Sequence, residues 1–300
     1  MLRVMRCVLK SVRFVLRALV DLFFPRCCVV CGDSLRLYEK HICTCCLAEM
    51  PYTYFWKYSG NPVEEVFVGR SYIETGCSLF YYTDSYRMMV HQLKYNSNVE
   101  IGLWLGQMLG EKLSGHLEKE NVQIDYIVPV PLHWRKQWKR GYNQSEVIAK
   151  GVVRGLVQGL VKNECKPFGT LISKSISRPV IIPDLIKRKR FTNTQTHKDK
   201  LDRWSNVCNA FEINRRYLAR FGRRGLGCRS LGCRGLGCRS LRLRGLRLRG
   251  FRYQVPDLAG KHVLLIDDVL TTGATLDACA NLLKQHCGCK VSIATLAFVE

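Results

Sequence analysis

Residues 261–275 read KHVLLIDDVLTTGAT, and this stretch decides the fold. Its first half is a continuous apolar run, which is typical of a parallel strand covered on both faces. After the threonine-glycine turn, a helical pattern extends to about Gln285, Gly288 predicts its end, and a last strand is expected from Val291 to Val299. Strand, loop, helix and strand form a βαβ unit. The loop therefore lies at the carboxyl end of the strand, where open α/β sheets bind ligands.

The turn itself suits a phosphate group. Thr271, Thr272 and Thr275 supply hydroxyl groups, and Gly273 lets the backbone approach a ligand. The helix that begins near Ala274 adds free N–H groups and the positive end of its dipole, so a phosphate monoester fits at this point.

Asp267 and Asp268 stand at the tip of the predicted strand. Ionised carboxylates accept hydrogen bonds without donating them, so they suit sugar hydroxyls and can hold a hydrated Mg²⁺ through its waters. A threonine-glycine turn alone is also an ordinary helix cap. The acidic pair placed just before the turn favours a site for a sugar phosphate.

The rest of the chain adds further α/β elements. An alternating stretch near Cys77 to Tyr82 predicts a strand, and one continuous helical pattern extends from Tyr86 to Leu113. Tyr126 to Pro131 is a short run of β-branched residues that ends in prolines, which predicts a buried strand followed by a loop. A helix is expected from Ser145 to about Leu160.

The loop between that strand and that helix is strongly basic. Arg140, Asn143 and Gln144 could serve a second anionic group such as pyrophosphate, and the alternative is a solvated basic helix start. Three aromatic residues lie among these basic residues and could stack on nucleic-acid bases, although packing against other helices is the commoner role. They are Trp134, Trp138 and Tyr142.

Composition sets the size and the charge. Three hundred residues of which 47% are hydrophobic predict one sizeable core and a smaller module. The net charge is +23, but 13 arginines in residues 215–252 leave only +10 for the remainder. A basic remainder suits phosphate-bearing ligands or nucleic acid, and charge alone does not choose between them.

Four of the 16 cysteines form two CxxC pairs, Cys28 with Cys31 and Cys43 with Cys46, separated by 11 residues. This spacing predicts a tetrahedral structural Zn²⁺ site, with reduced buried thiols or an iron–sulfur site as alternatives. Four thiolates leave no open position for catalysis. The neighbouring Cys27, Cys45 and His41 do not preserve the two pairs, and a surface position is expected for the histidine.

The sequence predicts no membrane-spanning helix. Residues 1–26 predict a basic amphipathic helix, packed on the protein or, less favourably, on a membrane surface; no apolar run reaches the roughly 18–20 residues of a transmembrane helix. No signal peptide is recognised, so a reducing, cytoplasmic setting is expected, in which clustered cysteines more often hold metal than form disulfides. Residues 226–250 are tandem pentapeptides within a low-complexity insert at about 220–252, for which we expect a disordered loop or, as the alternative, a nucleic-acid-binding arm.

The twin aspartates and the threonine-glycine turn resemble the motif with which type I phosphoribosyltransferases bind 5-phosphoribosyl 1-pyrophosphate (PRPP). VPVPLHW, RGYNQ, RKRFTNTQT…LDRWSNVCNAF and IDDVLTTGAT, in this order behind a paired-cysteine module, resemble the ComF family of phosphoribosyltransferase-like proteins. The resemblance implies the type I phosphoribosyltransferase fold, a parallel sheet flanked by helices, over residues 70–300. It also implies a small N-terminal zinc-binding module over residues 27–51.

The same resemblance implies roles for single residues. Asp267 and Asp268 would contact the ribose hydroxyls, and residues 271–275 would hold the 5-phosphate. Lys94 matches a family position and might otherwise be a solvated helix lysine. A further group matches the arginines, glutamine and asparagine that bracket the family's ligand cleft: Arg188, Arg190, Gln195, Arg203 and Asn206.

Two functions follow from the resemblance. One is a Mg²⁺-dependent, PRPP-binding phosphoribosyltransferase whose acceptor is unknown. The other is a non-catalytic accessory of natural competence that handles single-stranded DNA with the DNA-uptake machinery, in which the PRPP site is vestigial or regulatory.

Overall fold

The computed structural model of the chain describes residues 23–95, 98–164, 178–189, 210–214, 216–217 and 257–300. The helix expected over residues 1–26 lies outside the described residues except for its last four. The insert expected at about 220–252 lies entirely outside them.

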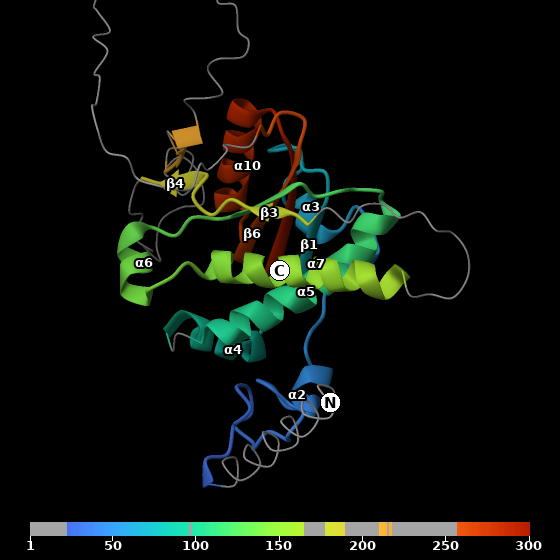
Figure 1. Cartoon of the computed structure of the whole chain (residues 1–300), viewed down its shortest axis with the longest axis vertical. Helices are drawn as coiled ribbons and strands as arrows, with labels where there is room; N and C mark the ends of the chain where they lie inside the picture. The colour runs from blue at the N-terminus through green and yellow to red at the C-terminus, as the bar shows by residue number, and fades with distance from the viewer. Residues whose placement is uncertain (1–22, 96–97, 165–177, 190–209, 215, 218–256) are drawn as a thin grey trace, which may run out of the picture.

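A five-stranded parallel sheet forms the centre of the molecule (Figure 1). Its strands follow the order β1-β7-β6-β2-β3. They are β1 (Gly76–Tyr81), β2 (Tyr126–Pro129), β3 (Val180–Ile181), β6 (His262–Leu270) and β7 (Lys290–Phe298). The prediction of an α/β fold with a parallel sheet flanked by helices is confirmed.

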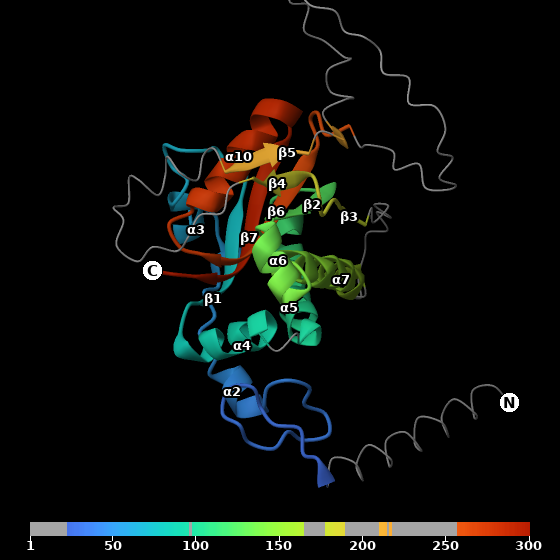
Figure 2. The same cartoon turned by 90° about the vertical axis from the view of Figure 1, so that its left-hand side faces the viewer.

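Helices cover both faces of this sheet (Figure 2). α5 (Val99–Lys119) and α7 (Gln144–Glu164) pack on one face with α4 (Asp84–Tyr95), and α10 (Ala274–Cys287) packs on the other with α3 (Pro62–Glu65). Successive side chains of a strand point to opposite faces. Accordingly Leu264 and Ile266 belong to the first core, whereas Val263 and Leu265 belong to the second, and all four are almost fully buried.

Shorter elements complete the chain. A separate antiparallel pair consists of β4 (Ile186–Arg188) and β5 (Phe211–Ile213). The remaining elements are α2 (Thr44–Ala48), the 3-10 helix η1 (Phe55–Lys57) and α6 (Trp134–Arg140).

β6 pairs with its two neighbouring strands over different lengths, and this difference creates the site. β6 pairs with β7 from His262 to Leu270, but with β2 only from Val263 to Ile266. The last link to that side is the bond from Val130 N–H to the Ile266 carbonyl oxygen, 2.9 Å. Pro131 follows and has no N–H to donate. From Asp267 onward, β6 therefore has a strand neighbour on one side only.

The continuous helix expected from Tyr86 to Leu113 is two helices. α5 starts anew because Asn98 caps it: its side-chain oxygen accepts a hydrogen bond from Ile101 N–H, 3.3 Å. An asparagine at this position satisfies a free N–H of the first turn. The apolar periodicity continues across the break, so the pattern alone did not reveal it.

The cysteine-rich segment shares the main core. Cys28 and Ile42 are buried in the same cluster as the α5 residues Leu105 and Leu109. The His41 ring also lies 5.8 Å from the ring of Trp104 on α5. His41 is therefore only partly exposed, because it packs against an aromatic ring, and it does not belong to the group of clustered thiols.

α5 and α7 cross with their backbones in close approach, and glycines make this possible. A Cβ built on Gly106 would overlap the carbonyl oxygen of Ile148, and one on Gly151 would overlap that of Leu103. Because both obstacles are backbone atoms, neither helix can yield by a side-chain rotation. This contact fixes where the N-terminal end of α7 lies beside the sheet.

We predict that Gly106→Ala lowers the free energy of unfolding by about 1–3 kcal/mol, the usual cost of overpacking. Gly115→Ala in the same helix is the control, because its Cβ would meet nothing within 4 Å. The control should be neutral or stabilising, by up to about 1 kcal/mol, because alanine is the better helix former. Urea unfolding measures both changes, and equal effects of the two substitutions would contradict the proposed contact.

Candidate functional site

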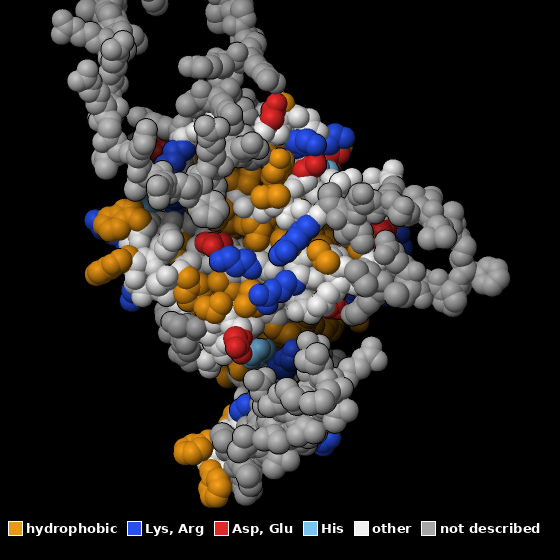
Figure 3. Space-filling view, viewed as in Figure 1, with side chains coloured by type: hydrophobic (Ala, Val, Ile, Leu, Met, Phe, Trp, Pro, Cys, Tyr) orange, Lys and Arg blue, Asp and Glu red, His pale blue; other side chains and the backbone are white. Residues whose placement is uncertain are grey.

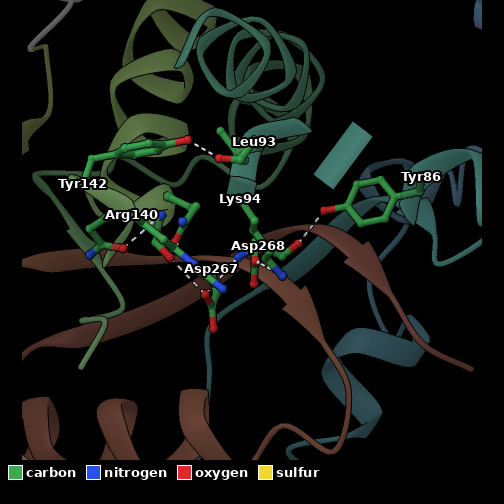
Figure 4. A network of polar contacts seen from close by, with 10 residues as sticks. Tyr86, Leu93, Lys94, Arg140, Tyr142, Asp267 and Asp268 are labelled. Carbon is green, nitrogen blue, oxygen red and sulfur yellow. Dashed lines mark hydrogen bonds and ion pairs between the residues drawn. The ribbon is translucent and has the colours of Figure 1, made fainter. Parts of the chain in front are cut away.

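The acidic pair lies where β6 has lost its β2 neighbour. The Asp267 Oδ1 atom accepts hydrogen bonds from Ser145 Oγ (3.0 Å) and from the backbone N–H of Asp268 (2.9 Å). Ser145 belongs to the first turn of α7. Both carboxylates are only partly buried. Figure 4 shows them on β6 with Lys94 and Arg140 nearby.

The environment disfavours the ionised form of Asp267. Burial, reinforced by the adjacent Asp268 charge, raises the pKa of Asp267 to about 7. Hydrogen bonds from Asp268 N–H and Ser145, and the charge of Lys94, act in the opposite direction. A carboxyl group with a pKa near neutrality responds strongly to any cation or hydrogen-bond donor brought by a ligand.

Side chains replace the missing strand beside Asp268. Alternate carbonyls of a strand point the same way, so the Asp268 carbonyl faces the side on which Ile266 was bonded to Val130. No β2 residue reaches it there. The hydroxyl of Tyr86, a fully buried residue of α4, donates to that carbonyl oxygen at 2.9 Å.

The other end of α4 is tied to the same region. The Asp268 Oδ2 atom forms an ion pair with the Lys94 Nζ atom at 2.8 Å. Next to Lys94, the carbonyl oxygen of Leu93 accepts a hydrogen bond from the hydroxyl of Tyr142 (Figure 4). Lys94 is thus part of the site, and it is not a solvated helix lysine.

The turn after β6 lines a pocket together with Asp267. Thr271 and Thr272 are exposed, and Gly273 caps α10 in the left-handed conformation with φ +74°. A Cβ on this glycine would also lie 2.5 Å from the Val66 Cγ1 atom. The first N–H groups of α10 have no intrahelical acceptor, so the pocket offers donors to an anion.

Basic side chains gather near this pocket. Burial and the charges of Arg188, Arg140 and Lys94 together lower the pKa of Lys136. Burial lowers the pKa of Arg188, while Asp267 acts against that shift. Arg188 comes from β4, so two separate segments of the chain bring cations to the same acidic pair.

The basic loop before α7 is ordered by its own polar groups. The Asn143 side chain donates to the Val130 carbonyl oxygen (3.0 Å) and accepts from Ser145 N–H (3.2 Å). Arg140 Nη1 donates to Gln144 Oε1 at 3.1 Å, whereas the buried Gln144 Nε2 atom has no hydrogen-bond partner among the described residues. Arg190, Gln195, Arg203 and Asn206 lie outside the described residues.

Two residues of the site were not anticipated from the sequence. Ser145 and Tyr86 contact the acidic pair. Lys136, one of the basic-loop residues expected to serve an anionic group, lies near the other cations. Ser145 could have been predicted, because it directly follows the expected loop residues, and a serine at that position can reach the end of a neighbouring strand. Tyr86 gave no such signal, since it lies 182 positions from its partner.

The two CxxC pairs meet in space. The Sγ atoms of Cys28, Cys31, Cys43 and Cys46 all lie within 4.8 Å of one another, and those of Cys31 and Cys43 are 3.7 Å apart. A tetrahedral Zn²⁺ site with Zn–S bonds of about 2.3 Å requires sulfur atoms roughly 3.8 Å apart. Cys27 and Cys45 are exposed and take no part in the group.

Comparisons with known proteins agree with this geometry. Residues 239–299 match the phosphoribosyl transferase domain. Competence protein F of Haemophilus influenzae is 22% identical over 278 residues, which is 88% of this chain and 93% of that protein. DNA utilization protein YhgH of Salmonella typhimurium is 25% identical over 213 residues, or 71% of this chain and 66% of that protein.

These likenesses, together with the four-cysteine group, support a ComF family protein. The matched domain includes β6, the acidic pair, the turn and α10, so the match covers the pocket itself. Among the helices that the structure describes, none combines the length and the apolar character that a membrane span needs.

One expectation about the basic loop was wrong. Trp134 and Trp138 of α6 do not pack between helices, because they are 62% and 87% exposed. The Arg135 guanidinium lies over the Trp134 ring at 5.3 Å from its centroid. In the space-filling view, hydrophobic and basic side chains stand side by side on the edge of the molecule where α6 lies (Figure 3).

Proposed function

We propose that this ComF protein binds PRPP with Mg²⁺ and transfers its phosphoribosyl group to an acceptor. The observation that carries the proposal is the pocket after β6, in which Asp267 of the acidic pair adjoins a threonine-glycine turn at a helix start. Lys94 of α4 pairs with Asp268, Arg188 of β4 interacts with Asp267, and Lys136 of α6 lies near both cations, as an anionic ligand requires.

Each group has a task in this proposal. The turn from Thr271 to Thr275 holds the 5-phosphate, and the carboxylates of Asp267 and Asp268 accept hydrogen bonds from the ribose hydroxyls. Carboxylate oxygens are also the donors that a hydrated Mg²⁺ prefers, and the metal would neutralise the pyrophosphate. Arg140 and Arg188 take the remaining pyrophosphate charge.

The reaction would be a displacement of pyrophosphate from the anomeric carbon of the ribose. Positive charge develops on the sugar ring as the bond to pyrophosphate lengthens. The acidic pair lies close enough to stabilise that charge, while the surrounding cations stabilise the leaving group. Catalysis would rest on holding both partners in position.

We predict that the wild-type protein binds PRPP in the presence of Mg²⁺ and that Asp267→Asn/Asp268→Asn weakens binding by at least about a hundredfold, because each charged hydrogen bond contributes about 1.5–3 kcal/mol. Isothermal titration calorimetry measures both affinities. Asp257→Asn, an exposed aspartate before β6, is the control and should bind like wild type. Equal affinities of the wild type and the double variant would refute the assigned site.

We further propose that the four-cysteine group holds a structural Zn²⁺. The sulfur distances support it, and so do the N–H groups of Cys43 and Cys46, which donate to sulfur atoms of the group at 3.3 and 3.4 Å. Such bonds stabilise thiolates, the form that binds metal. A site of this kind fits a reducing, cytoplasmic compartment, which we also propose.

Elemental analysis of purified protein is expected to find about one zinc per chain, as in other four-cysteine sites. Cys28→Ser/Cys46→Ser should lose the metal and fold less stably. Cys45→Ser should keep it, because this exposed neighbour lies outside the group. Zinc retained in the double variant would disprove the assignment.

A second function is a role in DNA uptake through binding of single-stranded DNA. The names of the relatives, Competence protein F and DNA utilization protein, support this link. The exposed Trp134 and Trp138 lie one helical turn apart on α6 and alternate with Arg135, Lys136 and Lys139. Aromatic rings between basic side chains suit stacked bases and a phosphate backbone.

We expect Trp134→Ala/Trp138→Ala to weaken binding of a single-stranded oligonucleotide roughly tenfold or more, because stacking contributes about 1–3 kcal/mol per base. Fluorescence anisotropy measured at several salt concentrations gives the affinities. Tyr72→Ala, which removes an equally exposed ring elsewhere, is the control. A deletion of residues 226–250 separates the contribution of α6 from that of the arginine-rich repeat. Unchanged affinity in the tryptophan variant would exclude α6.

A further inference from the structure

We propose that Lys94 is an exchangeable counter-ion that keeps free divalent cations away from the acidic pair. The metal would then enter only together with its anionic ligand, which takes over the Lys94 ammonium group. This inference deepens the proposed function and rests on it for the identity of the ligand. It concerns the order of binding at the site.

The ion pair occupies the place that a metal would need. Lys94 Nζ lies 2.8 Å from Asp268 Oδ2, and the two side chains are only 25% and 19% exposed. The Lys94 charge also acts on Asp267, whose pKa it lowers. The ammonium group therefore neutralises Asp268 directly and acts on Asp267 from a greater distance, so a bare cation approaching the pair would be repelled by a like charge at short range.

The backbone around Lys94 is held by hydrogen bonds to α4, whereas its side chain is held by the ion pair with Asp268. The Tyr86 hydroxyl fixes the start of α4 to the Asp268 carbonyl oxygen, and the Tyr142 hydroxyl fixes the Leu93 carbonyl oxygen near its end (Figure 4). Lysine carries its charge on a flexible four-carbon chain. Exchange from a carboxylate to a phosphate thus needs a side-chain rotation and no movement of the helix.

The neighbouring charges make the exchange depend on an anion. Arg188, Arg140 and Lys94 each lie close enough to Lys136 for their charges to lower the pKa of its ammonium group. If a metal displaced Lys94 from Asp268, the lysine would be left among these cations. An anionic ligand removes this penalty, because its phosphates pair with Lys94 as the metal arrives.

The alternative is a static ion pair that only fastens α4 to β6. Both models predict that removal of Lys94 changes stability. Only the counter-ion model predicts that removal of Lys94 creates affinity for a metal in the absence of any ligand. Mn²⁺ provides the probe, because it prefers oxygen donors over the cysteine sulfurs and its free form is measured by electron paramagnetic resonance.

The experiment titrates the full chain with Mn²⁺ alone. Lys94→Met should bind Mn²⁺ roughly tenfold or more tightly than wild type, because the competing charge is gone. Lys94→Arg, which keeps that charge, should behave like wild type. Adding Asp268→Asn to Lys94→Met should abolish the gain. If Lys94→Met does not fold, Lys94→Gln serves instead, since its amide can still donate to Asp268.

Equal Mn²⁺ affinity in wild type and Lys94→Met overturns the inference, and so does a gain that survives Asp268→Asn. The result is separable from the test of the proposed function. If Lys94→Met gains Mn²⁺ affinity but the protein does not bind PRPP, the counter-ion role of Lys94 stands and the assignment of PRPP as the ligand fails. If the protein binds PRPP but Lys94→Met gains no Mn²⁺ affinity, PRPP stands as the ligand and the counter-ion role of Lys94 fails.

Discussion

The site depends on one constraint: β2 ends at its prolines while β6 continues. Beyond Ile266, the β2 side of β6 has no strand to satisfy its polar groups. Buried backbone groups need partners, so the chain supplies them from side chains. Tyr86 takes the Asp268 carbonyl oxygen, and Ser145 and Lys94 take the carboxylates. Where the hydrogen bonds between β2 and β6 end, side chains from other elements thus contact Asp267 and Asp268 in place of a strand.

The helices that supply those groups are placed by their packing. α7 brings Ser145 to Asp267, and its position follows from the glycine contact with α5, which no side-chain rotation can adjust. α4 is joined to the site at both ends by tyrosine hydroxyls. The electrostatics of the acidic pair therefore rest on rigid elements, although the charged groups themselves sit on flexible side chains.

Local patterns predicted the parts of the fold that local forces determine. Three features could be predicted because each depends on neighbouring residues: the apolar run before Asp267, the turn at Gly273 and the helix end at Gly288. The break between α4 and α5 was missed, since the apolar period continues across it. The exposure of Trp138 and the contact of Tyr86 with β6 depend on distant parts of the chain, and periodicity carries no information about them.

The cysteine-rich segment has a wider influence than its size suggests. Cys28 and Ile42 lie in the same apolar cluster as α5, and His41 packs against Trp104 of that helix. Any ion held by the four sulfurs would consequently be thermodynamically linked to α5, the helix on which α7 and Ser145 rest. Loss of that ion would therefore destabilise the whole domain. The effect would reach the pocket after β6, although that pocket is built from the other end of the sequence.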